Sequence, residues 1–498
     1  MVLETERKFE APSTLAPDAL AQVTGYANPG MEEVDLAAEY FDTEDLRLLR
    51  SGVTLRRRTG GHDAGWHLKM PEGRDSRTEI QLPLTGSSQP PSALLEATRV
   101  YTLGAELVPV ATLNTHRMRW PLLDLGGHEV AELVDDVVSA FPAGTIAAPQ
   151  SWREVEVELR EGIDTSVLDV IEARLASLGV NRARDASKLV RALHGRIPAR
   201  RPPRIGKKTT AGEVVVEYLR TQADALRHFD PLAREDVPDA VHQMRVAARR
   251  MRGALQSFGD VLDRDRTREL VTELRWMAGE LAPARDAEVM TERFAGVLAG
   301  LPSELKIGPV ETETEVGLRA RTASAHESVS ATLTGARYLE LHRGIDALLR
   351  NPPFTRRARR RAQATLTAGI RKAFDRLEGR MAVVERSEAG PARELALHDA
   401  RKAAKRLRYA GEVAAPVLGK QAIRLRKRLE SVQSVLGEHQ DAVVARATLI
   451  ELGAQADRTG GHGFSYGVMH GIETARAAAA ERDLDKAWKR ARAAARRC

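Results

Sequence analysis

The sequence predicts an α+β protein, with strands in the first part of the chain and helices in the second. In residues 1–197, apolar and charged residues alternate along several short segments, as in strands with one buried face. From residue 210 onward, apolar residues recur every three or four positions, as on the buried face of a helix. Prolines interrupt residues 198–208, so neither period continues across them, and we place a linker there between domains 1–197 and 209–498.

The bulk composition excludes several classes of protein. At 498 residues, the chain is long enough for about two to four domains of ordinary size. Its net charge of +7 favours polyanionic partners. No apolar run approaches the roughly 18 residues that span a bilayer, and the acidic start does not resemble a signal peptide, so we expect a cytoplasmic protein without membrane association. The sole cysteine, Cys498, excludes an intrachain disulfide and a thiolate metal cluster.

Short strands separated by turns make up most of the first domain. The alternation is clearest at residues 53–58, 115–120 and 154–159, and glycine or proline turns lie at 59–61, 71–73 and 126–127. Between these strands, we predict helices at residues 18–25, 94–103 and 167–178.

The N-terminal strand carries the most specific pattern. Glu4, Glu6 and Lys8 lie at every second position, so they share one face of a strand. Two acids and a base side by side are unfavourable in a dry core, but they suit a metal ion and the phosphates that it carries. Taken alone, the pattern favours a charged edge strand or a frayed terminus. The rest of the chain has to decide between these interpretations.

The helical domain contains a basic stripe beside a buried one. Val241, Met244, Ala248, Met251 and Leu255 form an apolar helix face. One residue further along, the same spacing gives a basic stripe, which consists of His242, Arg245, Arg249 and Arg252.

This stripe is duplicated. His398, Arg401, Lys405 and Arg408 each lie 156 residues after a member of the first stripe, and Lys402 adds a further cation. A second pair of similar segments, 281–287 and 436–442, is offset by 155 residues. Two matched segments at nearly one offset predict two copies of one helical unit, packed as two small bundles about a pseudo-twofold axis.

Pseudo-symmetry brings both stripes to one channel or groove in this arrangement. A dense cluster of Arg and Lys is destabilising unless an anion neutralises it, although a single stripe is usually a solvated face. The scarcity of aromatic residues disfavours single-stranded nucleic acid and favours a phosphate chain without bases; nucleic acid stays open as an alternative partner. The two histidines donate to phosphate or cap their helices. The basic clusters 356–361 and 489–497 extend the anion track or are solubilising surface.

Together, these motifs resemble two known domains. The strand motif E-x-E-x-K, the segment 40–58 and Trp66 to Lys69 are similar to the CYTH family, also known as triphosphate tunnel metalloenzymes. The duplicated basic helices resemble the CHAD domain, the conserved-histidine α-helical domain. The two resemblances cover residues 2–490, in the order found in CYTH-CHAD proteins.

The CYTH resemblance implies a closed antiparallel β-barrel, or tunnel, with charged side chains inside. It implies phosphate binding by Lys8, Arg56, Arg58, Lys69, Arg117, Arg119 and Lys188. It implies Mg²⁺ or Mn²⁺ binding by Glu4, Glu6, Glu154, Glu156 and Asp135, with Asp136 and Glu158 as alternatives where the register is open. Glu4, Glu6, Lys8 and Lys188 are the expected catalytic residues.

From these residues we expect a metal-dependent triphosphatase that hydrolyses inorganic tripolyphosphate or a related triphosphate. The CHAD resemblance adds inorganic polyphosphate as the ligand of the two stripes, and an association with polyphosphate granules. Two alternatives remain: an adenylate cyclase, because the CYTH family includes cyclases, and a non-enzymatic adaptor that docks on polyphosphate.

Overall fold

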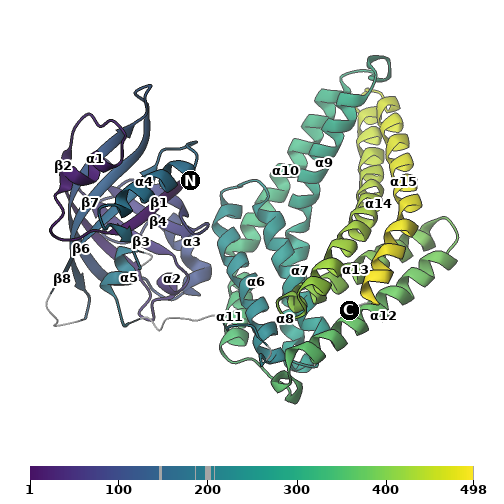
Figure 1. Ribbon diagram of the computed structural model, residues 1–498. Coiled ribbons are helices and arrows are strands. Elements are labelled where there is room, and N and C mark those ends of the chain that lie inside the picture. Colours follow the sequence, from purple (N-terminus) through teal and green to yellow (C-terminus); the bar gives the residue numbers. More distant parts are fainter. Residues whose placement is uncertain (145–148, 185–186, 197–202, 207, 497–498) are drawn as a thin grey trace. The chain divides into compact units, whose positions relative to one another are not determined.

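The computed structural model describes residues 1–144, 149–184, 187–196, 203–206 and 208–496. It divides into two compact units, Met1–Arg200 and Arg201–Cys498. Of the predicted linker 198–208, residues 198–202 and 207 lie outside the described residues, as does Arg497 of the basic tail. Figure 1 shows strands in the first unit and helices in the second, as the two periods of the sequence predict.

The first unit is a closed antiparallel β-barrel. Its strands are β1 (Val2–Glu10), β2 (Glu32–Asp42), β3 (Thr54–Thr59), β4 (Gly65–Pro71), β5 (Ser76–Leu82), β6 (Val108–Leu123), β7 (Glu129–Pro142), β8 (Gln150–Leu159) and the short β9 (Asn181–Arg182). They follow the order β5-β4-β3-β2-β6-β7-β8-β1-β9, and pairing of β5 with β1 closes the sheet. Closure leaves the eight barrel strands, β1 to β8, with an inner and an outer face. The expected barrel is therefore confirmed.

The outer face of one side of the barrel is covered by α1 (Pro17–Val23) and α4 (Ser166–Ala176). Leu20 and Ile171 of these helices pack against outward residues such as Trp120 and Val157, all of them buried. Two further helices, α2 (Arg47–Arg50) and α3 (Ser92–Thr102), lie between strands in the sequence. The predicted helices 18–25, 94–103 and 167–178 thus correspond to α1, α3 and α4.

One part of the barrel interior is apolar. The short helix α5 (Lys188–Ala192) contributes Leu189 and Ala192 to a cluster with the inward residues Leu113, Val138 and Trp152. Further along the same strands, the inward residues are charged. Apolar packing therefore fills one region of the interior and leaves the remainder polar. This division positions the candidate site.

The second unit is entirely helical in the described residues. Its helices are α6 (Ala211–Arg234), α7 (Ala240–Ser257), α8 (Arg264–Glu280), α9 (Ala282–Gly300), α10 (Val310–Thr334), α11 (Ala336–Arg350), α12 (Ala362–Arg386), α13 (Pro391–Leu418), α14 (Lys420–Arg458) and α15 (Phe464–Ala495), with 3₁₀ turns η1 (Ser303–Leu305) and η2 (Arg356–Arg359). Within those residues, no helix combines the length and apolarity needed to cross a lipid bilayer.

The two sequence repeats fall on matching helices. The stripes lie on α7 and α13, which pack against each other. The second pair of repeats falls at the junction of α8 and α9 and in the middle of the single helix α14. Pro283 lies in the first turn of α9, where a backbone N–H would have no partner within the helix, so the missing N–H of proline is tolerated. Glu438 occupies the equivalent position in α14. The proline therefore marks the place where one copy breaks its helix and the other continues.

Candidate functional site

The interior of the barrel holds a charged cavity of about 290 Å³. This volume lies just below the range for small-molecule sites, roughly 300–1,000 Å³. Its charged lining comprises Glu4, Glu6, Lys8, Glu32, Arg56, Arg58, Asp63, Lys69, Arg77, Arg117, Arg119, Glu132, Glu156, Glu158, Arg160 and Lys188. Most of these residues alternate along strands, so the period of two places them on one face.

β1 supplies the first wall. Glu4, Glu6 and Lys8 all point inward, as their alternation predicts. Lys8 Nζ donates to Glu6 Oε2 at 3.0 Å and to Glu156 Oε1 on the neighbouring β8. The strand register places Glu6 opposite Glu158, so the acidic pattern of β1 is continued across β8.

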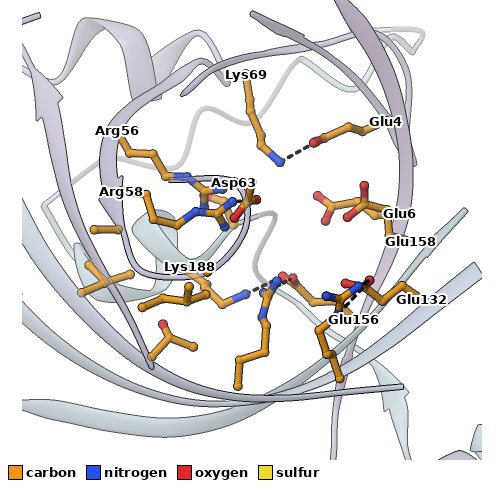
Figure 2. Close-up of a pocket in the computed structure, with 18 of the residues that line it drawn as sticks. Glu4, Glu6, Arg56, Arg58, Asp63, Lys69, Glu132, Glu156, Glu158 and Lys188 are labelled. Atoms are coloured by element: carbon orange, nitrogen blue, oxygen red, sulfur yellow. Dashed lines mark hydrogen bonds and ion pairs between the residues drawn. The ribbon is translucent and has the colours of Figure 1, made fainter. Parts of the chain in front are cut away.

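Cations from β3 and β4 face this wall. Figure 2 shows Arg56 and Arg58 on one side of the cavity and Glu6 with Glu158 on the other, while Lys69 extends toward Glu4. Lys69 Nζ donates to Glu4 Oε2, and Arg58 forms an ion pair with Asp63. Within the described residues, the buried Nε atoms of Arg56 and Arg58 have no hydrogen-bond partner.

The charge on Arg58 is only partly compensated. Burial, and then the neighbouring Arg56 and Arg117, lower its pKa to about 9. An anion bound between these guanidinium groups would relieve this repulsion. This side of the cavity is therefore suited to phosphate oxygens, which arginine binds in a bidentate manner.

Lys188 lies at the centre of a third group. Its Nζ lies 2.6 Å from Glu156 Oε1, 2.9 Å from Asp136 Oδ2 and 3.3 Å from Glu154 Oε1. Arg117 donates two hydrogen bonds of 2.7 Å to Asp136. Although burial alone favours the neutral amine, Asp136 and the two glutamates hold the pKa of Lys188 well above its usual value.

The structure corrects the choice of Asp135 as a metal ligand. Asp135 lies on the outer face of β7, where its carboxylate accepts hydrogen bonds of 2.8 and 2.7 Å from Arg153. Asp136, the alternative, points inward to Arg117 and Lys188. Successive residues of a strand face opposite sides, so a one-residue uncertainty in register exchanges the two carboxylates.

We expect substitutions of these two aspartates to have different effects. For the triphosphatase activity that the sequence leads us to expect, Asp136→Asn should lower phosphate release by roughly tenfold, because Arg117 and Lys188 lose the carboxylate that orients them. Asp135→Asn should leave the rate of the folded protein unchanged but lower its free energy of unfolding by roughly 3 kcal/mol, since Arg153 loses its buried partner. Phosphate-release kinetics and urea denaturation measure the two effects. Equal rates for the two variants would contradict this assignment.

Glu4 and Glu6 on β1 and Glu158 on β8 form an acidic wall. Their buried carboxylates disfavour one another's charged forms. Burial, together with Glu79, raises the pKa of Glu4 to about 8, and burial also raises the pKa of Glu158. For Glu6, burial acts in the same direction, but the charges of Lys8, Lys69 and Arg77 together outweigh it and lower the pKa.

This donor set fits a hard divalent cation. In the described residues, no three His, Cys, Asp or Glu side chains are arranged as a preformed metal-binding group, and lysines contact the inward glutamates instead. Carboxylate oxygens are nevertheless the ligands that Mg²⁺ and Mn²⁺ prefer, and a cation would relieve the raised pKa values of Glu4 and Glu158. Glu154 lies outside the cavity lining, beside Trp152 and Lys188.

Several charged residues in or beside the cavity lining were not expected from the sequence. On β5, Arg77 Nε lies 3.5 Å from Glu6 Oε1, and Glu79 Oε1 is hydrogen-bonded to His67 Nδ1 at 2.6 Å. Glu132 on β7 holds Arg119 at 2.6 Å. Charged residues alternate at positions 77 and 79, on the strand that follows Lys69. This alternation would have identified Arg77 and Glu79 from the sequence.

The helical unit brings the two basic stripes together. Arg250 Nε lies 3.0 Å from Glu412 Oε2, and Arg406 donates to Gln256 Oε1 at 2.6 Å. Arg406 and Glu412 lie 156 residues after Arg250 and Gln256, so the two contacts exchange equivalent positions of α7 and α13. This reciprocity is the mark of a pseudo-twofold axis between the helices.

The stripes themselves carry excess positive charge. In the described part of the chain, the buried Nε atoms of Arg245, Arg249, Arg401 and Arg408 have no hydrogen-bond partner. Burial, then Arg401 and Arg249, lower the pKa of Lys405 to about 7, so cations of both helices act on one ammonium group. Arg252 shows the same effect of burial on its pKa.

The structure excludes one of the two alternatives for the stripe histidines and separates Lys402 from the stripes. Neither histidine caps its helix, because Asp239 and Gly390 are the N-cap residues of α7 and α13. His398 Nδ1 instead bonds Gln440 Oε1 at 2.7 Å, and burial followed by Arg285 lowers the pKa of His242 to about 4. Lys402 is exposed and contacts Asp399 of its own helix at 3.5 Å, so it does not join the other cations.

Comparison with known proteins agrees with this architecture. The CYTH domain family matches residues 3–193, and the CHAD domain family matches residues 217–450. Among solved structures, PptA from Streptomyces chartreusis is 24% identical, with a TM-score of 0.48, over 56% of this chain and 100% of its own. The CHAD domain from the plant Ricinus communis is 23% identical, with a TM-score of 0.47, over 60% and 97%.

Full-length relatives occur in Mycobacterium tuberculosis. The proteins named MT2285, from strain CDC 1551 / Oshkosh, and Rv2226, from strain H37Rv, are each 35% identical over 514 residues, which cover 98% of this chain and 98% of theirs. Domain matches and full-length similarity together show that the chain belongs to the family of proteins in which a CYTH domain precedes a CHAD domain.

Proposed function

We propose that the barrel is a metal-dependent triphosphatase that hydrolyses inorganic tripolyphosphate or a related short triphosphate. CYTH family members are metal-dependent triphosphatases or cyclases. The observation that carries the proposal is the separation of charge within one cavity, where Arg56, Arg58 and Lys69 face the glutamates of β1 and β8 (Figure 2). A site for anion binding alone would need only the cationic side.

The residues of the chain divide the reaction between them. Arg56, Arg58 and Lys69 bind phosphate oxygens and stabilise the negative charge of the transition state. Lys188 and Arg117, held by Asp136, orient the substrate from the third group. Glu4, Glu6 and Glu158 would hold Mg²⁺ or Mn²⁺, which would neutralise phosphate charge and lower the pKa of a bound water.

Hydrolysis then needs one proton acceptor and no covalent intermediate. A carboxylate of the acidic wall accepts a proton from water as the water oxygen bonds to the terminal phosphorus. The bond from that phosphorus to the bridging oxygen breaks, and tripolyphosphate yields orthophosphate and pyrophosphate. The inward position of the glutamates supports this role.

The direct test is phosphate release from tripolyphosphate by the full chain with Mg²⁺ or Mn²⁺. We expect metal-dependent release that EDTA abolishes. Cyclic AMP formed from ATP, measured in parallel, would support the cyclase instead. Absence of both products with either metal would leave the adaptor as the remaining function.

We also propose that the paired stripes of α7 and α13 bind inorganic polyphosphate. CHAD domains are linked to polyphosphate. The buried guanidinium Nε atoms without a hydrogen bond and the lowered pKa of Lys405 support this proposal, because a long polyanion would neutralise several of these cations at once.

Lys405 makes this binding depend on pH. With its pKa near 7, Lys405 loses its proton as the pH of the free protein rises, whereas a bound polyanion favours the ammonium form. Binding therefore takes up a proton, and we expect the affinity for polyphosphate to fall by roughly tenfold between pH 7 and pH 8.5. Titration calorimetry at several pH values measures this. Lys405→Arg stays charged and should flatten the dependence; an unchanged slope would contradict the role of Lys405.

A further inference from the structure

A second basic cavity lies in the helical unit, at the C-terminal end of α7. It has a volume of about 180 Å³ and lies between α7, η2 and the start of α12. Its polar lining consists of Ser257, Asp260, Arg357, Arg360, Arg361, Thr365 and Lys372. Three of the four cations come from the arginine-rich segment 356–361, which neither proposed activity uses.

The structure fixes this arginine segment on both sides. Before it, Phe354 forms a β-bridge with Leu262, and the backbone N–H of Thr355 donates to Val261 O at 2.9 Å. At its last residue, Arg361 forms a β-bridge with Thr210. A segment held at both ends presents its side chains in a defined arrangement, unlike a mobile solubilising run of arginines.

Charge in the cavity is not balanced. Asp260 is the one carboxylate of the lining, and its Oδ2 lies 3.1 Å from Arg357 Nη1. Among the residues that the structure describes, Arg360, Arg361 and Lys372 form no ion pair. The buried Oγ of Ser257 also lacks a hydrogen-bond partner within the described residues. A hydroxyl group together with convergent cations is a typical donor set for a phosphate oxyanion.

The cavity is distinct from the stripe on α7. Gln256 lies one turn beyond Arg252 on the stripe face and bonds Arg406. Ser257 follows directly, and successive residues of a helix are about 100° apart, so its side chain points away from the stripe. The cavity therefore opens beside the proposed polyphosphate site without belonging to it.

We propose that this cavity binds a multivalent phosphate oxyanion, in addition to the tunnel and the paired stripes. The ligand is a free anion, such as orthophosphate or pyrophosphate, or a terminal phosphate of a longer chain. The proposal does not depend on the tunnel chemistry, because no residue of the barrel takes part.

Hydrogen exchange of the full-length protein, followed by mass spectrometry, locates the binding. At a pyrophosphate concentration ten times the dissociation constant, we expect exchange from residues 355–366 to slow by about tenfold. In Arg360→Gln with Lys372→Gln, the affinity of this site should fall by roughly 100-fold, and the protection should disappear. Both side chains are exposed, so the variant should fold.

The segment itself offers a matched control. Arg356→Gln with Arg359→Gln removes the same charge from neighbouring exposed positions that do not line the cavity. Protection in this control, and its loss in the cavity variant, would support the site. Equal loss in both variants, or protection that persists in the cavity variant, would overturn it.

A second titration identifies the source of the anion. Protection of residues 355–366 by pyrophosphate supports a free anion or a chain end. Protection by long-chain polyphosphate alone would overturn the proposal, because pyrophosphate carries the same terminal phosphate groups, and would assign the cavity to the interior of the polymer. Protection by neither probe would overturn the proposal.

Discussion

Replacing Glu4 and Glu6 together by glutamine should reduce metal-dependent phosphate release from tripolyphosphate by roughly 10³-fold. Both side chains face the cavity, and glutamine keeps their size while removing two oxygen ligands and the proton acceptor. The amides also remove one charged partner from each of Lys8 and Lys69, which keep Glu156 and Glu79, so binding of the anion itself should persist. Initial rates with Mg²⁺ and with Mn²⁺, together with substrate binding by calorimetry, separate the two effects.

The outer face of the barrel provides the control. Glu33 and Glu39 on β2 alternate with the cavity-lining residues Glu32, Val34 and Tyr40, so they point away from the cavity. Replacing both by glutamine makes the same change of charge and should leave the rate unchanged. A Glu4 and Glu6 variant that retains the normal rate would reject the proposed triphosphatase site.

The second large effect concerns the helical unit. Replacing Arg245, Arg249, Arg401 and Lys405 by glutamate reverses four charges that converge from α7 and α13. Each lost phosphate contact weakens binding to a polyanion, so we expect the affinity for polyphosphate to fall by at least roughly 10³-fold. Hydrolysis of tripolyphosphate should continue, because the tunnel is built entirely from the other unit.

A control with equal change of net charge distinguishes a site from general attraction. Arg268, Arg319, Arg343 and Arg350 are exposed, and each lies within reach of an acidic residue on its own helix. Their replacement by glutamate should weaken binding only slightly at physiological salt, where such distant charges are screened. Comparable losses in the two variants would show that net charge, and no defined groove, attracts polyphosphate.

The two sequence periods were sufficient to predict the class of fold and the inward face of β1. Alternation assigns Glu4, Glu6 and Lys8 to one face without any knowledge of the other strands. Closure of the sheet was different. It depends on the pairing of β5 with β1, which lie far apart in the sequence, and only the resemblance to a family predicted it.

The errors in the site have one physical cause. Asp135 and Asp136 are adjacent, and the choice between them depends on the register of β7, which pairing with β6 and β8 determines. His67 and Glu79 were missed because their pattern has meaning only when β4 and β5 lie beside Glu4. The sequence left open whether the stripe histidines donate to phosphate or cap their helices, and the caps are excluded only by the helix starts at Asp239 and Gly390.

The exchanged contacts of Arg250 with Glu412 and Arg406 with Gln256 have a consequence for the shape of the ligand. A twofold arrangement presents the same donors to a chain molecule whichever way round that chain lies along the groove. Peptides and nucleic acids have a direction, so each would fit one half of such a groove differently from the other. An inorganic chain of identical phosphates reads the same forwards and backwards, and a duplicated helix is the simplest protein surface that does so too.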